Sequence, residues 1–264
     1  MKIFELENDS VYDLFEPKKG VSLDRARDRG ASESSLKAPA YRAATSTAER
    51  RTVNIGASGK LKLHVLDLGR LRLDKNFMVA NSTIATHKNP NPRGQIIDIP
   101  VAAYYIEHPD GNVLFDTGCH PDWAGPNGRW PDSLQDLFPH VGGEECMLPA
   151  RLDMMGVGPD DVEYVVMSHL HCDHAGCVEY FRKSKIIVHE DEFAGAFRQY
   201  ARQDHGSPYA LKDLERMIHA QLNWREIGRE EPDQNIVEGV RLLNFGPGHA
   251  RGIWHAGHCR QPDQ

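Results

Sequence analysis

The sequence predicts a mixed fold of the α/β or α+β class, because strand-like segments alternate with helical ones along most of the chain. Three observations support this. Apolar and polar residues alternate from Leu61 to Gly69, as in a strand with one buried face. A Pro-Asp-Gly-Asn turn at 109–112 joins two further strand-like runs. The segment 162–167 is rich in apolar, β-branched residues, as expected of a buried strand.

The remaining elements follow in order, and no internal repeat interrupts them. Strands are expected at 61–69, 101–106, 113–115, 162–167, 185–188 and 240–245, and helices at 174–182, 190–202 and 209–220. Residues 1–60 lack apolar periodicity, so we expect a disordered or loosely packed extension that the core does not need. A targeting or regulatory arm is the alternative. The predicted domain spans 61–252, and 253–264 reads as a divergent tail.

The composition is that of an ordinary globular protein, with 40% hydrophobic and 26% charged residues in 264. A net charge of −7 gives no basic bias towards nucleic acid or anionic lipid, so neither is expected as a partner. No apolar run approaches the ~20 residues of a membrane helix, and the acidic start does not resemble a signal peptide, so we expect a cytoplasmic protein. The five cysteines form no Cys-x-x-Cys pair, which argues against a disulfide framework and a thiolate zinc site.

One segment carries ligand-type side chains directly after a buried strand. His169 and His171 alternate, so both imidazoles point the same way in an extended chain and can reach one ion. Asp173 and His174 follow where the chain turns, and they can face a second ion. Imidazole and carboxylate are ligands that Zn²⁺ prefers. A tag, a surface accident or a polar helix face is the alternative explanation.

Two further segments could complete such a site. His249 ends a Gly-Pro-Gly turn after a predicted strand and could be the third neutral ligand of a His₃ site, or an ordinary loop histidine. Asp116 follows another strand and precedes Thr117-Gly118. Its carboxylate could orient a ligand histidine, or it could be a helix N-cap or turn residue.

Together, the His-x-His-x-Asp-His, Asp-Thr-Gly and Pro-Gly-His motifs resemble the metallo-β-lactamase superfamily. From Leu61 to His249 the chain is most similar to the N-acyl homoserine lactonase family. The resemblance implies an α+β fold, an αββα sandwich of two similar halves. It implies hydrolysis of a small-molecule lactone by two zinc ions, hence degradation of quorum signals, with Asp173 accepting or relaying a proton. The implied ligands are His169, His171 and His249 for the first ion, and Asp173 and His174 for the second.

The family pattern continues past Pro-Gly-His with an aspartate that bridges both metals and a last histidine, whereas fifteen residues follow His249 here. We expect a chain truncated or frame-shifted at this end, with an incomplete second half, one or two zinc ions, exposed sheet and weak or absent activity. The alternatives are completion by another chain, or replacement ligands at His255, His258 or Cys259.

Two other functions stay open. One is a different hydrolase on the same fold, acting on another lactone or on a thioester. Thioester-cleaving relatives usually carry a second histidine three residues after Pro-Gly-His, where this chain has Gly252. The other is a catalytically dead remnant that only binds metal.

Overall fold

A computed structural model describes the backbone of residues 51–55, 61–79 and 83–246, and the side chains of all these residues except the first five. The larger sheet contains β1 (Arg51–Ile55), β2 (Leu61–Asp74), β3 (Ile96–Glu107), β4 (Val113–Phe115), β5 (His140–Val141), β6 (Tyr164–Val166), β7 (Lys185–His189) and β8 (Asn223–Ile227). A hairpin contains β9 (Gln234–Val237) and β10 (Val240–Leu242). The helices are α1 (Asp132–Leu137), α2 (Leu148–Asp153), α3 (Cys172–Ala175), α4 (Glu190–Arg202) and α5 (Leu211–Ala220).

The larger sheet is antiparallel at one end and parallel at the other. Its strand order is β1-β2-β3-β4-β6-β7-β8, and β5 pairs with β2. Strands β1 to β4 pair antiparallel, whereas β4, β6, β7 and β8 run parallel to one another. The carboxyl ends of these parallel strands therefore lie along one edge, which is where open α/β sheets place their binding sites.

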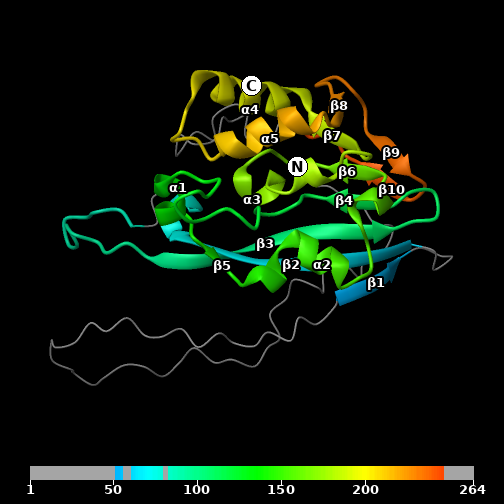
Figure 1. The fold of residues 1–264 in the computed structure, drawn as a ribbon. Helices are drawn as coiled ribbons and strands as arrows, with labels where there is room; N and C mark the ends of the chain where they lie inside the picture. Colours follow the sequence, from blue (N-terminus) through cyan, green and yellow to red (C-terminus); the bar gives the residue numbers. More distant parts are fainter. Residues whose placement is uncertain (1–50, 56–60, 80–82, 247–264) are drawn as a thin grey trace, which may run out of the picture.

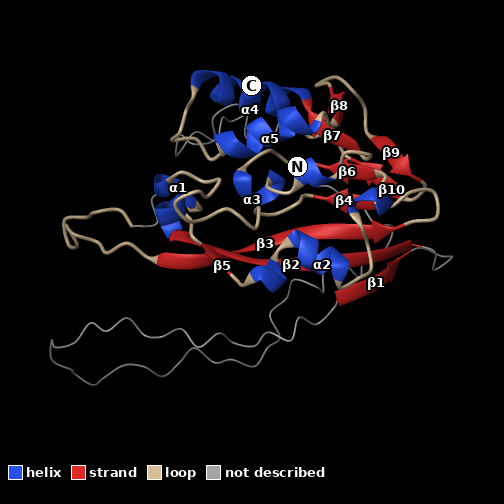
Figure 2. Ribbon diagram, viewed as in Figure 1, coloured by secondary structure: helices blue, strands red, loops and turns tan. Residues whose placement is uncertain are grey.

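Both faces of the parallel strands are buried. Figures 1 and 2 show α4 and α5 side by side over one side of the sheet, where Leu214 and Met217 join the larger apolar core. On the other face, Val166 and Ile187 pack with Val240 of the β9–β10 hairpin. Burial on both faces explains why β4, β6 and β7 are almost continuously apolar.

The interleaved strands and helices confirm the predicted mixed class, and α4 has the predicted bounds. The expected helix over 174–182 was wrong: α3 ends at Ala175, and a separate 3-10 turn covers Val178–Tyr180. Gly176, directly after α3, packs closely against the backbone of a neighbouring loop. A β-carbon at Gly176 would lie 2.3 Å from the backbone nitrogen of His120.

The first predicted strand begins at Leu61, as β2 does, but the prediction missed β1 before it. β1 pairs with β2 from Arg51↔Val65 to Ile55↔Leu61. Five residues are too short a run for alternation alone to distinguish an edge strand from a loop. The sequence also gave no clear signal for the short elements α1, α2, β5, β8 and β9. The rest of the predicted extension and the tail after Gly246 lie outside the described residues.

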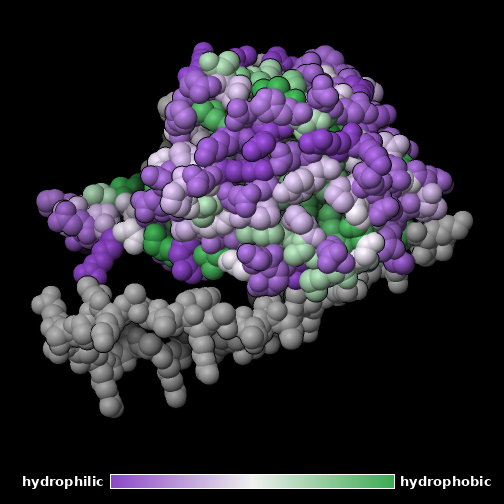
Figure 3. Space-filling model, in the orientation of Figure 1, coloured by the Kyte–Doolittle hydropathy of each residue, from purple (hydrophilic) through white to green (hydrophobic). Residues whose placement is uncertain are grey.

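The visible surface is mainly hydrophilic, with hydrophobic side chains in separate small groups (Figure 3). Among the residues that the structure describes, no helix combines the length and apolar character needed to cross a membrane.

Candidate metal centre

The predicted ligand segment lies at the carboxyl edge of the parallel strands. β6 leads through Met167 and Ser168 into the histidines, and the neighbouring β4 leads directly into Asp116. Asp116 has a φ of 57°, in the left-handed region that aspartate tolerates better than most residues. This conformation occurs just where the chain leaves β4 and reaches the candidate centre.

Three of the predicted ligands converge. One potential ligand atom from each of His169, Asp173 and His174 lies within 4.8 Å of the other two, and the ring centroids of His169 and His174 are 4.0 Å apart. This group does not include His171, whose ring packs edge-on against His169 at 4.5 Å. Two imidazoles and a carboxylate suit a borderline divalent cation such as zinc. His249 lies outside the described residues.

Asp116 joins the ends of β4 and β6 and holds a ligand side chain. Its Oδ2 lies 2.7 Å from Nδ1 of His174, and it also accepts a hydrogen bond of 2.7 Å from the Ser168 hydroxyl. Its Oδ1 accepts the Ser168 backbone N–H at 2.8 Å. When Nδ1 donates to Asp116, Nε2 of His174 keeps its lone pair for an ion. Asp116 is thus placed to orient the predicted ligand His174, and it caps none of the described helices.

The charges in the cluster reinforce one another. Burial acts against a charge on Asp173, but the neighbouring His174 and His171 outweigh it and lower the Asp173 pKa to about 2. Burial likewise opposes a charge on His174, but Asp173 and Asp116 hold the His174 pKa well above its usual range. Nε2 of His174 lies 3.4 Å from the Asp173 carboxylate. In the metal-free protein, the proton on Nε2 of His174 supplies the positive charge that faces the Asp173 carboxylate. A divalent cation between the same two groups would supply that positive charge instead.

The loop after Asp116 is locked to the short helix α3. The backbone N–H and the hydroxyl of Thr117 both donate to the carbonyl oxygen of His174, at 2.6 and 2.9 Å. Gly176 N–H donates to the carbonyl of Gly118 at 2.8 Å. Sequence reasoning did not identify the need for glycine at 176. Its only sequence signal is a glycine placed directly after the ligand helix.

A second buried carboxylate, Glu192 in the first turn of α4, was also missed. It accepts hydrogen bonds from the Leu170 backbone N–H at 3.0 Å and from the Tyr209 hydroxyl at 2.9 Å. The ring of Tyr209 packs edge-on against His171, with centroids 4.7 Å apart. The available signal was weak: an acidic residue just after β7, at the same edge of the sheet as the ligands.

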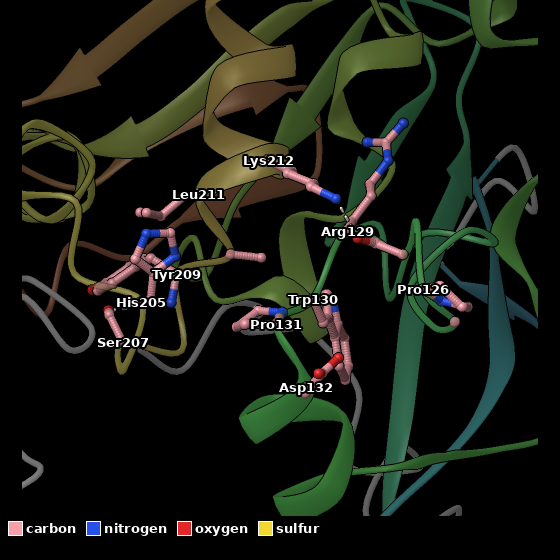
Figure 4. Close-up of a pocket in the computed structure, with 13 residues that line it drawn as sticks. Pro126, Arg129, Trp130, Pro131, Asp132, His205, Ser207, Tyr209, Leu211 and Lys212 are labelled. Carbon is pink, nitrogen blue, oxygen red and sulfur yellow. Dashed lines mark hydrogen bonds between the residues drawn. The ribbon is translucent and has the colours of Figure 1, made fainter.

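A cavity of about 160 Å³ lies between the loop that ends in Trp130 to Asp132 and the segment His205 to Lys212, which face one another in Figure 4. None of the predicted ligands that the structure describes lines this cavity. Tyr209 lines the cavity, and its ring packs on His171.

Comparison with known proteins gives a consistent picture. Residues 96–258 match the family model described as the metallo-beta-lactamase superfamily. Over 192 residues the chain is 54% identical to N-acyl homoserine lactonase AiiB of Agrobacterium fabrum, covering 73% of this chain and 70% of that protein. A lactonase with the same name from Rhizobium rhizogenes is 52% identical over 192 residues, with the same coverage.

The fold is similar to that of a solved N-acyl homoserine lactone hydrolase with N-hexanoyl-L-homoserine bound at its catalytic metal centre. The TM-score is 0.53 and the sequence identity 29%, covering 69% of this chain. This chain spans 64% of the length of that hydrolase.

Proposed function

Because this chain belongs to the metallo-β-lactamase superfamily and to its N-acyl homoserine lactonase family, we propose that it is a zinc-dependent hydrolase of N-acyl homoserine lactones. It would open the lactone ring and so degrade quorum signals. The observation that carries the proposal is the meeting of His169, Asp173 and His174 within 4.8 Å at the carboxyl edge of the sheet. The similarity of the chain to N-acyl homoserine lactonases supports acyl homoserine lactones as the substrate class.

The proposed ligands divide between two ions. His169, His171 and His249 hold the first, and Asp173 and His174 contribute to the second. Asp116 supports the second set because it accepts the hydrogen on Nδ1 of His174. A bound zinc ion would act as a Lewis acid for the lactone carbonyl and would lower the pKa of a zinc-bound water to about 7.

Asp173 is the proposed proton carrier. The neighbouring His174 and His171 lower the Asp173 pKa to about 2 and keep the carboxylate ionised at neutral pH. In this proposal the carboxylate accepts or relays the proton of the attacking water. The new bond joins the water oxygen to the lactone carbonyl carbon, and the ring C–O bond breaks. One proton of the water passes to the departing ring oxygen and the other is released to solvent, which leaves an alcohol and a carboxylate in one N-acyl homoserine.

Asp173 and His174 are the described side chains that we assign to the second ion, and a catalytic zinc usually has three protein ligands. The zinc content per chain, measured by elemental analysis, tests whether this chain holds the second ion as well as the first.

The test of function is an assay of the full chain, with zinc supplied, against several N-acyl homoserine lactones. Hydrolysis is measured as the release of protons. A thioester and a simple γ-lactone serve as comparison substrates. The expected result is zinc-dependent opening of the acyl homoserine lactones, which His169→Ala abolishes. Preference for the thioester, or zinc binding without any turnover, would refute the proposed activity.

A further inference from the structure

The ligand loop, Ser168 to Cys172, is held at alternate backbone positions although it belongs to no strand. Every second N–H in it donates to a neighbouring segment. These bonds run from Ser168 to the Asp116 carboxylate at 2.8 Å, from Leu170 to the Glu192 carboxylate at 3.0 Å, and from Cys172 to the Pro208 carbonyl at 3.1 Å. The intervening residues, His169 and His171, carry the proposed ligands. The backbone is therefore fixed on both sides of each ligand.

Glu192 is the least expected of these anchors. Its side chain is fully buried, and Oε1 accepts from both the Leu170 N–H and the Tyr209 hydroxyl. A buried carboxylate is costly unless hydrogen bonds satisfy it, so these donors and the carboxylate fix one another in place. The position of Glu192 in the first turn of α4 also favours a negative charge.

Through Tyr209 the same carboxylate reaches a ligand ring. Burial and the nearby Glu192 raise the pKa of Tyr209, so the hydroxyl keeps its hydrogen and remains a donor. The Tyr209 ring packs edge-on on His171 at 4.7 Å. Glu192 thus fixes the backbone between His169 and His171 and also a ring that limits the rotation of His171.

We propose that Glu192 is a positioning residue of the metal centre, which sets the spacing of His169 and His171 without touching an ion. The inference rests on the proposed function in one respect: it takes these histidines as ligands. It predicts that loss of Glu192 loosens the ligand loop first and weakens metal binding as a consequence.

The experiment compares Glu192→Ala and Glu192→Gln with the matched control Leu214→Ala, all in the full chain. Leu214 is fully buried in the same helical core, and its truncation lowers stability without removing a hydrogen-bonding group. Two quantities are measured: the zinc dissociation constant, by competition with a chelator, and amide hydrogen exchange across 168–172 in the metal-free protein.

Glu192→Ala should weaken zinc binding roughly tenfold or more, the usual effect of removing a group that orients ligands. It should also speed exchange in the ligand loop. Glu192→Gln keeps an oxygen acceptor and should stay within about threefold of the original chain. Leu214→Ala should change the zinc dissociation constant and the exchange rate of the ligand loop much less than Glu192→Ala does.

Equal effects of Glu192→Ala and Leu214→Ala on both quantities would overturn the inference, since Glu192 would then be only structural. Absence of zinc binding in the unaltered chain would instead overturn the proposed function. Exchange in the metal-free protein would still decide whether Glu192 holds the loop.

Discussion

Asp116 and Glu192 are both buried carboxylates that accept a backbone hydrogen bond from the ligand loop, but they differ in their other contacts. Asp116 accepts the Nδ1 hydrogen of His174 and so acts directly on a proposed ligand. Glu192 reaches the ring of His171 through Tyr209. We therefore expect Asp116 to set both the orientation and the protonation of a proposed ligand, and Glu192 to set its geometry.

Removal of a proposed ligand should cause the largest loss of bound zinc, against which the effects of Asp116 and Glu192 variants are compared. We expect His169→Ala to lose most of its bound zinc, because His169 is one of the three potential ligands that lie within 4.8 Å of one another. Elemental analysis after dialysis checks the prediction. Full zinc retention would show that the metal is held elsewhere, and both anchors would then lose their assigned role.

Asp116→Ala should have the next largest effect, with zinc binding weakened up to about a hundredfold. It frees Nδ1 of His174 and removes the carboxylate that accepts from the half-buried Ser168 N–H and hydroxyl. Asp116→Asn is the matched control, since it keeps an acceptor oxygen for part of this network. Chelator competition measures both variants. A smaller loss for Asp116→Ala than for Glu192→Ala would reverse the comparison.

The contrast also shows what the sequence could reveal. Asp116 was identified as a candidate because it stands in a short motif directly after a strand, and its contact with His174 agrees with that role. Glu192 is nearly twenty residues beyond the ligands, and its bonds to Leu170 and Tyr209 arise only when α4 and the segment before α5 pack together. Local patterns find ligands that lie close together in the chain. They do not find side chains brought to a site by tertiary packing.

The secondary structure also contains parts that the sequence predicts and parts that it does not. The alternating run at β2 and the apolar run at β6 were predictable, because burial of one or both faces dictates their composition. The short strand β1 and the break at Gly176 were not. β1 depends on pairing with β2, and Gly176 depends on the close approach of the His120 backbone.

The pH dependence of the metal-free protein should separate the two anchors. Asp173 and Asp116 outweigh burial and raise the His174 pKa above its ordinary value of 6.5. The stability that this provides is present in full below pH 6.5 and is lost as the pH rises through the folded-state pKa. In Asp116→Asn the folded-state pKa of His174 should be lower, so the loss should be smaller and should end at lower pH.

Glu192→Gln should leave this profile unchanged, because the Leu170 amide and the Tyr209 hydroxyl do not titrate in that range. Urea unfolding of the metal-free variants at several pH values above 6 makes the comparison. An equal shift in both variants would mean that the charge of Glu192 also acts on His174, and the division between protonation and geometry would fail.

The smallest expected effect is that of Tyr209→Phe. The ring can still pack on His171, but Glu192 loses the hydroxyl donor and keeps the Leu170 N–H. Loss of one such buried bond costs about 1–3 kcal/mol of folding stability. Because the ligand rings remain supported, zinc binding should weaken only about two- to threefold. Tyr200→Phe, on the partly buried face of α4, is the control for loss of a hydroxyl.

The zinc dissociation constants of Tyr209→Phe and Glu192→Ala then show which bond of Glu192 fixes the proposed ligands, the one from the Leu170 N–H or the one from the Tyr209 hydroxyl. A near-normal zinc affinity in Tyr209→Phe, together with a large loss in Glu192→Ala, would assign the anchoring to the Leu170 backbone bond. If Tyr209→Phe instead weakens zinc binding as much as Glu192→Ala, the hydroxyl bond carries the effect. Glu192 would then act through the ring on His171, and the ligand loop backbone would be held chiefly by Asp116 and by the Cys172–Pro208 bond.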